Sequence, residues 1–292
     1  MAAGPVLGGW LVDLAGWRAV FLINVPISLL VLLLCRGPAP AGSSRRPLSP
    51  APHLGLAITL ASGTLAITEG GRGHWPAVTV AAAVALGCAV VTVWLDRRSA
   101  APLIPGSLRR NAAVRAAGLW AAMINFALVT VLFSLPLLLP RNALALGVTL
   151  LPMTILIAVN PLLTARLVVR RGPLLPIRLG FGAFLAGAVA ITVALAGELS
   201  PLLLGIGLVG CGLGVSWTLP PLVGYAVGQA PPDGAGAVGG LINAVRQVGA
   251  TLGAATAGVA LGAGRSAVPL IGAAVVCLGG LVGSLVHRPG RS

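Results

Sequence analysis

The chain has 292 residues, of which 57% are hydrophobic and only 8% are charged. In soluble domains about a quarter of the residues are charged, so this composition, with a mean hydropathy of +1.02, excludes a soluble globular protein. The nineteen cationic and five acidic residues give a net charge of +14. These cations are spread over successive connections without interleaved aromatic residues, which argues against a nucleic-acid partner.

The apolar residues lie in ten blocks that are separated by short breaks. In chain order the blocks cover residues 1–12, 19–35, 54–70, 77–95, 116–139, 143–165, 179–197, 199–228, 235–264 and 266–286. Most have roughly the 17–25 residues that cross a hydrocarbon core of about 30 Å, with almost no formal charge inside. The pattern predicts an all-α polytopic protein that crosses a lipid bilayer repeatedly.

The first block differs from the others in length. A helix over residues 1–12 rises only about 18 Å at 1.5 Å per residue, which is too short to span the bilayer. The block also lacks the basic segment and the cleavage site of a signal peptide. We therefore expect the chain to begin within a membrane helix, as a truncated gene model or a domain fragment would.

The arginines gather in every second break between the blocks. Fifteen fall on one predicted face: Arg36, Arg45, Arg46, Arg97, Arg98, Arg109, Arg110, Arg115, Arg166, Arg170, Arg171, Arg178, Arg246, Arg288 and Arg291. The opposite face has Arg18, Arg72, Arg141 and Arg265. Short loops retain cations in the cytoplasm during insertion, and basic loops suit an anionic inner leaflet. The sequence therefore predicts a multi-pass protein of the cell membrane with a cytoplasmic C-terminus.

Residues 4–9 read GPVLGG, and residues 16–26 read GWRAVFLINVP. Together they resemble the antiporter motif and the start of the next helix in the fourteen-helix drug:proton antiporters of the major facilitator superfamily. The resemblance implies a motif that seals the outer side of a transport pathway, formed by Gly4, Pro5, Gly8 and Gly9. From the residues alone, Gly4 and Gly8 share one helix face that lets another backbone approach, and simple close packing remains an alternative.

Two later segments carry the same resemblance. Residues 165–172 read ARLVVRRG and are similar to the GRLxDRxGRR loop of the family, with Ala165 in place of a glycine and Val169 in place of the acid. The cytoplasmic gate loop that this implies comprises Arg166, Arg170, Arg171 and Gly172. Residues 234–253 are similar to the family signature GxxxxLxNxxRQxGxxLG.

The resemblance implies the major facilitator fold, with helices five to fourteen of fourteen present. Its parts would be the end of the N-terminal bundle at 1–35, a cytoplasmic linker at 36–53, two central extra helices at 54–95, a second cytoplasmic linker at 96–111, and the C-terminal six-helix bundle with a short cytoplasmic tail at 112–292. We expect both linkers to be solvated.

Polar side chains inside the blocks are candidate site residues, because an unpaired amide or charge in hydrocarbon is costly and generally faces the bundle interior. The substrate-binding candidates are Asn125, Trp217, Phe126, Trp120 and Asn160. The intramembrane gating candidates are Asn24, Asn243, Arg246 and Gln247. Other interpretations stay open. The asparagines would form interhelical hydrogen bonds, the tryptophans would anchor at the interface, and Arg246 would snorkel toward the inner surface or pair with the partner bundle.

Two further patterns concern helix geometry. Glycines four residues apart predict close helix contacts, and the pairs are Gly210 and Gly214, Gly249 and Gly253, Gly258 and Gly262, and Gly279 and Gly283. Prolines inside the blocks predict breaks in regular helix, which helices rocking around a central site would use. These prolines are Pro136, Pro152, Pro161, Pro220 and Pro221.

The sequence contains no catalytic motif and no His or Cys cluster at metal-ligand spacing, so we expect neither an enzyme nor a metal or other cofactor. The resemblance implies proton-coupled efflux of drugs or other amphipathic or cationic small molecules by a monomer that works by alternating access. The five acids fall in breaks or at block ends, so the coupling carboxylate is expected in helices upstream. The alternative is a non-transporting membrane fragment or a scaffold that binds a partner protein.

Overall fold

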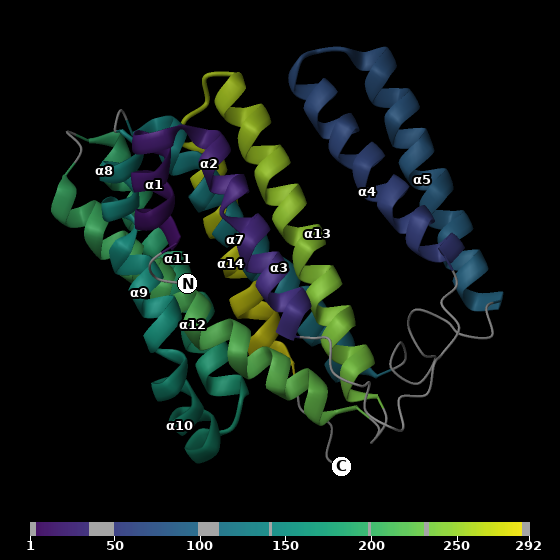
Figure 1. The fold of residues 1–292 in the computed structure, drawn as a ribbon. Helices are drawn as coiled ribbons and strands as arrows, with labels where there is room; N and C mark the ends of the chain where they lie inside the picture. The colour runs from purple at the N-terminus through teal and green to yellow at the C-terminus, as the bar shows by residue number, and fades with distance from the viewer. Residues whose placement is uncertain are drawn as a thin grey trace.

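Every regular element in the described part of the chain is an α-helix. The computed structural model describes residues 4–34, 50–98, 111–139, 142–197, 200–230 and 234–287, and Figure 1 shows how the helices are arranged. Their bounds are α1 Gly4–Ala15, α2 Trp17–Leu22, α3 Asn24–Leu34, α4 Pro50–Gly71, α5 Trp75–Arg98, α7 Ala112–Leu138, α8 Ala143–Thr149, α9 Leu151–Val159, α10 Pro161–Arg171, α11 Leu174–Ala196, α12 Pro201–Gly228, α13 Ala235–Gly262 and α14 Val268–Val286. The predicted all-α fold is confirmed.

Seven stretches of the described residues are long and apolar enough to cross a membrane. α2 and α3 together form one of them, Trp17–Leu34. α9 and α10 would add an eighth if the 49° bend between them lies within a single span. The prediction of a multi-pass membrane protein is therefore confirmed by helix length and composition.

α7 and α9–α14 form a packed helix bundle. α12 lies along α11 and also contacts α7, α9, α10 and α13, while α7 packs against α13 and α14. Ile124, Leu135, Phe181, Phe184 and Leu208 are fully buried in its core. Within this bundle, α12 is therefore the helix with the most neighbouring helices.

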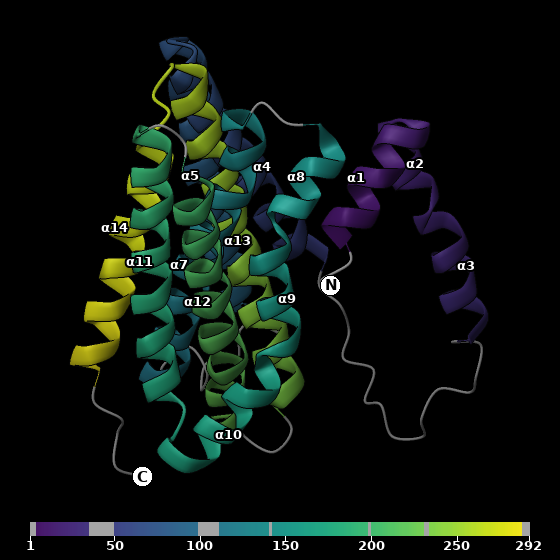
Figure 2. The same cartoon turned by 90° about the vertical axis from the view of Figure 1, so that its left-hand side faces the viewer.

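The remaining helices lie at the side of this bundle. α4 and α5 form a hairpin whose α4 packs against α13, whereas α1 packs against α8. Figure 2 shows α1, α2 and α3 standing beside the bundle next to α8. None of the residues in Trp17–Leu34 is buried, so this apolar surface faces away from the described chain.

Successive helix ends alternate between two ends of the molecule. In Figure 1 the α4–α5 turn, the α13–α14 turn and α8 lie at the upper end, and α10 lies at the lower end. Arg72 and Arg265 belong to the two upper turns and Arg171 ends α10. The structure thus separates these arginines as the alternation predicted. Arg141 lies outside the described residues.

Several helices extend beyond the predicted boundaries. α4 begins at Pro50, inside the predicted linker 36–53, because a proline in the first helical turn lacks an amide that would have no partner there. α5 continues to Arg98, inside the predicted linker 96–111, because cations at a helix C-terminus interact favourably with the helix dipole. Residues 36–49 and 99–110 of the linkers lie outside the described part.

The prolines affect the helices in two different ways. Pro152 and Pro161 lie in the first turns of α9 and α10, so the predicted block at 143–165 is divided into three helices. Pro136 lies inside α7, and α12 continues through Pro220 and Pro221. The predicted breaks are thus confirmed at Pro152 and Pro161. They are wrong at Pro136, Pro220 and Pro221.

Glycine allows backbone contact at two of the four predicted pairs. A Cβ added to Gly210 would meet the Cα of Gly187 at 2.9 Å, and one added to Gly249 would meet the backbone carbon of Ala122 at 2.8 Å. These contacts join α11 to α12 and α7 to α13. The pairs without a backbone neighbour within 4 Å are Gly258 and Gly262, and Gly279 and Gly283.

Candidate functional site

Asn125 and Arg246 meet where α7 packs against α13. Asn125 is 5% exposed, and its Nδ2 donates a 2.9 Å hydrogen bond to the backbone carbonyl of Arg246. The Oδ1 of Asn125 and the Nε of Arg246 are both buried without a hydrogen-bond partner among the described residues. Since unsatisfied buried polar atoms are rare in native proteins, this contact offers one acceptor and one cationic donor to a further group.

Asn160 lies at the bend between α9 and α10. Its Nδ2 donates to Ser216 Oγ of α12 at 2.7 Å. Thr164 Oγ1, one turn further along α10, lies 3.0 Å from the carbonyl of Asn160 and 3.3 Å from that of Ser216. Asn160 is therefore engaged in an interhelical hydrogen bond, which was the alternative to a substrate contact.

The three aromatic candidates occupy different environments. Trp120 is 2% exposed and packs edge-to-face with the ring of His287, at 5.3 Å between centroids. Phe126 and Trp217 are half-buried, so part of each ring is available for contact. The structure therefore places Trp120 in the core, which does not support its predicted contact with substrate.

The remaining gating candidates lie at the surface of the described chain. Asn243 and Gln247 are exposed on α13, on either side of the half-buried Arg246 along the sequence. Asn24 is also exposed and donates to the carbonyl of Val20, one turn earlier, at 3.3 Å. Of the four gating candidates, the structure thus joins only Arg246 to a substrate-binding candidate.

The predicted gate loop is mostly helical. Arg166, Arg170 and Arg171 belong to α10, and Arg170 and Arg171 form its last turn. Gly172 ends the helix with a φ of 77°, a backbone conformation that glycine adopts without steric cost. The prediction of a loop is wrong for these arginines, because cations are favoured at a helix C-terminus and no residue before Gly172 interrupts the helix.

Of the glycines in the GPVLGG segment, Gly9 is the one that lies against α8. A Cβ added to Gly9 would meet the backbone carbon of Ala143 at 2.8 Å, whereas one added to Gly4 or Gly8 has no neighbour within 4 Å among the described residues. The predicted close packing at Gly4 and Gly8 is therefore not seen among the described residues. Because each helical residue is rotated by about 100° from the one before it, Gly9 rather than Gly8 faces α8. The side chain of Pro5 lies outside the described part.

Asp13 follows Gly9 by one helical turn and contacts the same helix. Its Oδ2 accepts a 3.1 Å hydrogen bond from the backbone amide of Leu144. The adjacent amide of Ala145 donates to the side chain of Asn142 at 2.9 Å. Asp13 was not among the predicted site residues, although its spacing from Gly9 places both on one helix face.

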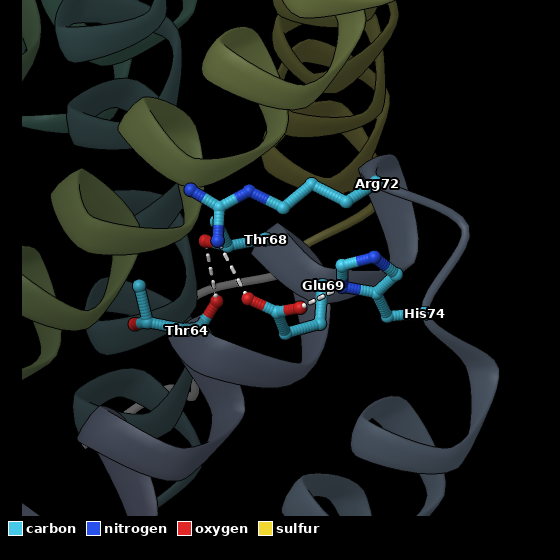
Figure 3. Close-up of polar contacts among 5 residues, drawn as sticks. All are labelled: Thr64, Thr68, Glu69, Arg72 and His74. Carbon is cyan, nitrogen blue, oxygen red and sulfur yellow. Dashed lines mark hydrogen bonds and ion pairs between the residues drawn. The ribbon is translucent and has the colours of Figure 1, made fainter.

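A second acid stabilises the turn between α4 and α5. Arg72 Nη1 lies 2.7 Å from Glu69 Oε1, and His74 Nδ1 lies 2.8 Å from Glu69 Oε2. Figure 3 shows the carboxylate between these two partners. All three residues belong to the same hairpin, so this cluster holds the turn without joining it to the bundle.

A groove of about 650 Å³ lies between α4 and α13. Its lining residues are Thr64, Thr68, Gly71, Arg72, Phe133, Thr251, Ala254, Ala255, Gly258, Val259 and Gly262. None of the five substrate-binding candidates belongs to this lining. Within the described ranges, no three His, Cys, Asp or Glu side chains are grouped so that they could hold a metal ion.

Comparison with known proteins gives one family and several relatives. The family Major Facilitator Superfamily matches residues 1–254. The multidrug resistance protein Stp of Mycobacterium tuberculosis is 30% identical over 90% of this chain and 50% of its own length. The methylenomycin A resistance proteins of Streptomyces coelicolor and Bacillus subtilis are 31% and 32% identical over 88% of this chain, and 56% and 57% of theirs. The chain thus spans about half the length of these relatives.

Proposed function

Because this chain belongs to the major facilitator superfamily, we propose that it forms part of a secondary transporter that exports amphipathic or cationic small molecules across the cell membrane. The observation that carries the proposal is the similarity to drug and antibiotic resistance proteins over nearly the whole chain. The transporter works by alternating access, in exchange for protons, with its C-terminus in the cytoplasm.

The substrate passes along the faces of α7, α12 and α13 that carry partly exposed candidates. Phe126 and Trp217 provide aromatic surface for an amphipathic molecule, and Asn243 and Gln247 provide polar contacts. Asn125 positions the backbone of α13 beside this route. Asn160 keeps α10 attached to α12.

Proton coupling requires a carboxylate that binds and releases a proton during the cycle. The described acids Asp13, Glu69 and Asp96 lie in the last turns of α1, α4 and α5, away from the middle of these helices. The proposal therefore places the coupling carboxylate outside these three positions.

Efflux from proteoliposomes tests the proposal. The purified chain is reconstituted, and the efflux of a fluorescent lipophilic cation is followed with and without a pH gradient. We expect efflux above that of empty liposomes, and a change in the relative rates of two cations for Trp217→Ala. A rate that depends on the gradient would place the coupling carboxylate in this chain. The matched control is Trp75→Ala, because Trp75 is a 67% exposed tryptophan at the start of α5, away from the proposed route. Absence of efflux above empty liposomes would overturn the proposal for this chain.

The second candidate function is a membrane scaffold that does not transport. The uncovered apolar surface of Trp17–Leu34 favours it, because surfaces of this kind pack against lipid or another protein. The same reconstitution separates the two candidates. A scaffold would be stable in liposomes and give no efflux under any gradient.

A further inference from the structure

The contact between α1 and α8 joins two helices that alternating access would have to separate. Among the described helices, α8 is the principal neighbour of α1 outside the α1–α3 segment. Figure 2 shows the two helices side by side at the end of the molecule opposite α10. On the proposed orientation this end is the outer one, and the contact closes it.

Two residues of α1, one turn apart, contribute a backbone approach and a hydrogen bond to this contact. Gly9 is buried, and an added Cβ would meet the Cα of Leu144 at 3.0 Å as well as the backbone of Ala143. Asp13 accepts a hydrogen bond from the amide of Leu144 at 3.1 Å. The glycine thus permits the approach and the carboxylate adds a directed polar bond at the same residue of α8.

The partner of Asp13 is a backbone group that its own helix leaves unpaired. The first amides of a helix have no carbonyl one turn earlier to receive them, and Leu144 is the second residue of α8. Asn142 satisfies the next amide, that of Ala145, so α8 depends on α1 for the Leu144 amide. A hydrogen bond to a carboxylate is stronger than one between neutral groups.

We propose that Asp13 is a positioning residue that latches α1 to α8 and thereby favours the state that is closed at this end. The inference rests on the proposed transport function, because a latch between these helices matters only if they separate. When α1 and α8 part, water takes the place of both partners, so the bond contributes only to the closed state.

Distance measurements between spin labels test the latch without relying on transport. Labels are attached to Leu14→Cys on α1 and Val148→Cys on α8, both exposed positions, in a background whose native cysteines are replaced by alanine. We expect a predominantly short distance in the parent. Asp13→Ala should raise the ratio of separated to close populations by about tenfold, which is near the lower end of the range for loss of a hydrogen bond to a charged group.

Two further variants make the result specific. Asp13→Asn keeps an acceptor oxygen without the charge and should give an intermediate ratio; it also replaces Asp13→Ala if that variant does not fold. Glu69→Gln changes another acid at the same end whose partners all lie in its own hairpin, and should leave the distances unchanged. Unchanged distances in both Asp13 variants would overturn the latch.

The latch and the transport function fail in different ways. If the parent exports the cation and the Asp13 variants keep its distances, the latch is wrong and the proposed function stands. If Asp13→Ala separates the labels in a chain that does not transport, the contact is real and the proposed function is wrong.

Discussion

Asn125 of α7 donates its side-chain amide to the backbone carbonyl of Arg246 on α13, 2.9 Å away and 121 residues further along the chain. Immediately beside this bond, Gly249 admits the backbone of Ala122. Close backbone packing and an interhelical hydrogen bond therefore stabilise the same crossing. Such bonds hold helices together in a bilayer, where the hydrophobic effect does not.

Replacing Asn125 should affect stability before it affects specificity. Asn125→Leu keeps a similar side-chain volume and removes the donor, and we expect the free energy of unfolding in detergent to fall by about 0.6 kcal/mol, an average value for such bonds. Chemical denaturation followed by tryptophan fluorescence measures this. Asn243→Leu, at an exposed position on α13, is the control for the stability measurement alone. If Asn125→Leu changes the ratio of efflux rates for two cations at unchanged stability, Asn125 contacts substrate directly.

The bond between Asn160 and Ser216 should appear as a coupling energy. We expect Asn160→Ala and Ser216→Ala each to lower the unfolding free energy, and the double variant to cost less than the sum by about 0.5–1.5 kcal/mol. The reason is that both substitutions remove the same 2.7 Å hydrogen bond. Unfolding of the four proteins in one detergent gives this number. Additive losses would mean that the two side chains act independently.

The sequence predicted where the helices lie along the chain far better than it predicted which residues meet between them. Block length and the alternation of arginines depend only on neighbouring residues and on the bilayer, so both could be predicted from the sequence alone. Whether Gly8 or Gly9 faces α8 depends on the rotation of α1, which is set by a helix more than 130 residues away. Ser216, likewise, is a small polar residue that is unremarkable until the α9–α10 bend brings Asn160 beside it. Local pattern thus gives the spans, while tertiary packing decides which polar residues meet.

Gly187 should be intolerant of a methyl group. An added Cβ would meet the amide nitrogen of Cys211 and the carbonyl oxygen of Gly207, both at 2.6 Å, and backbone atoms cannot move aside as a flexible side chain does. We expect Gly187→Ala to destabilise the protein by about 1–3 kcal/mol. Gly182→Ala, on the same helix with open space around the added atom, should be neutral or stabilising by up to about 1 kcal/mol. Thermal unfolding of the two variants makes the comparison, and equal melting temperatures would contradict the α11–α12 contact.

Gly8 and Gly9 should differ in their effect on efflux although they are neighbours in one motif. Gly9→Ala places a methyl group against the backbone of Ala143 only when α1 is close to α8, so it disfavours the closed state. A clash of about 1.4 kcal/mol confined to that state would shift the equilibrium about tenfold. We expect slower efflux for Gly9→Ala and parental efflux for Gly8→Ala, both at parental expression. Equal rates would show that the motif acts through Gly8 or through a partner beyond the described residues.

The two ends of the molecule should face different compartments. Arg265 lies in the exposed turn between α13 and α14, and Arg171 lies at the exposed end of α10. Because short arginine-rich connections stay in the cytoplasm, a cysteine at position 265 should react with a membrane-impermeant maleimide added to intact cells. A cysteine at position 171 should react only after the membrane is permeabilised. Arg265→Cys and Arg171→Cys are made in the cysteine-replaced background, and labelling is read by gel shift. Reaction of both in intact cells would contradict the alternation of helices across the bilayer, and the opposite pattern would reverse the orientation.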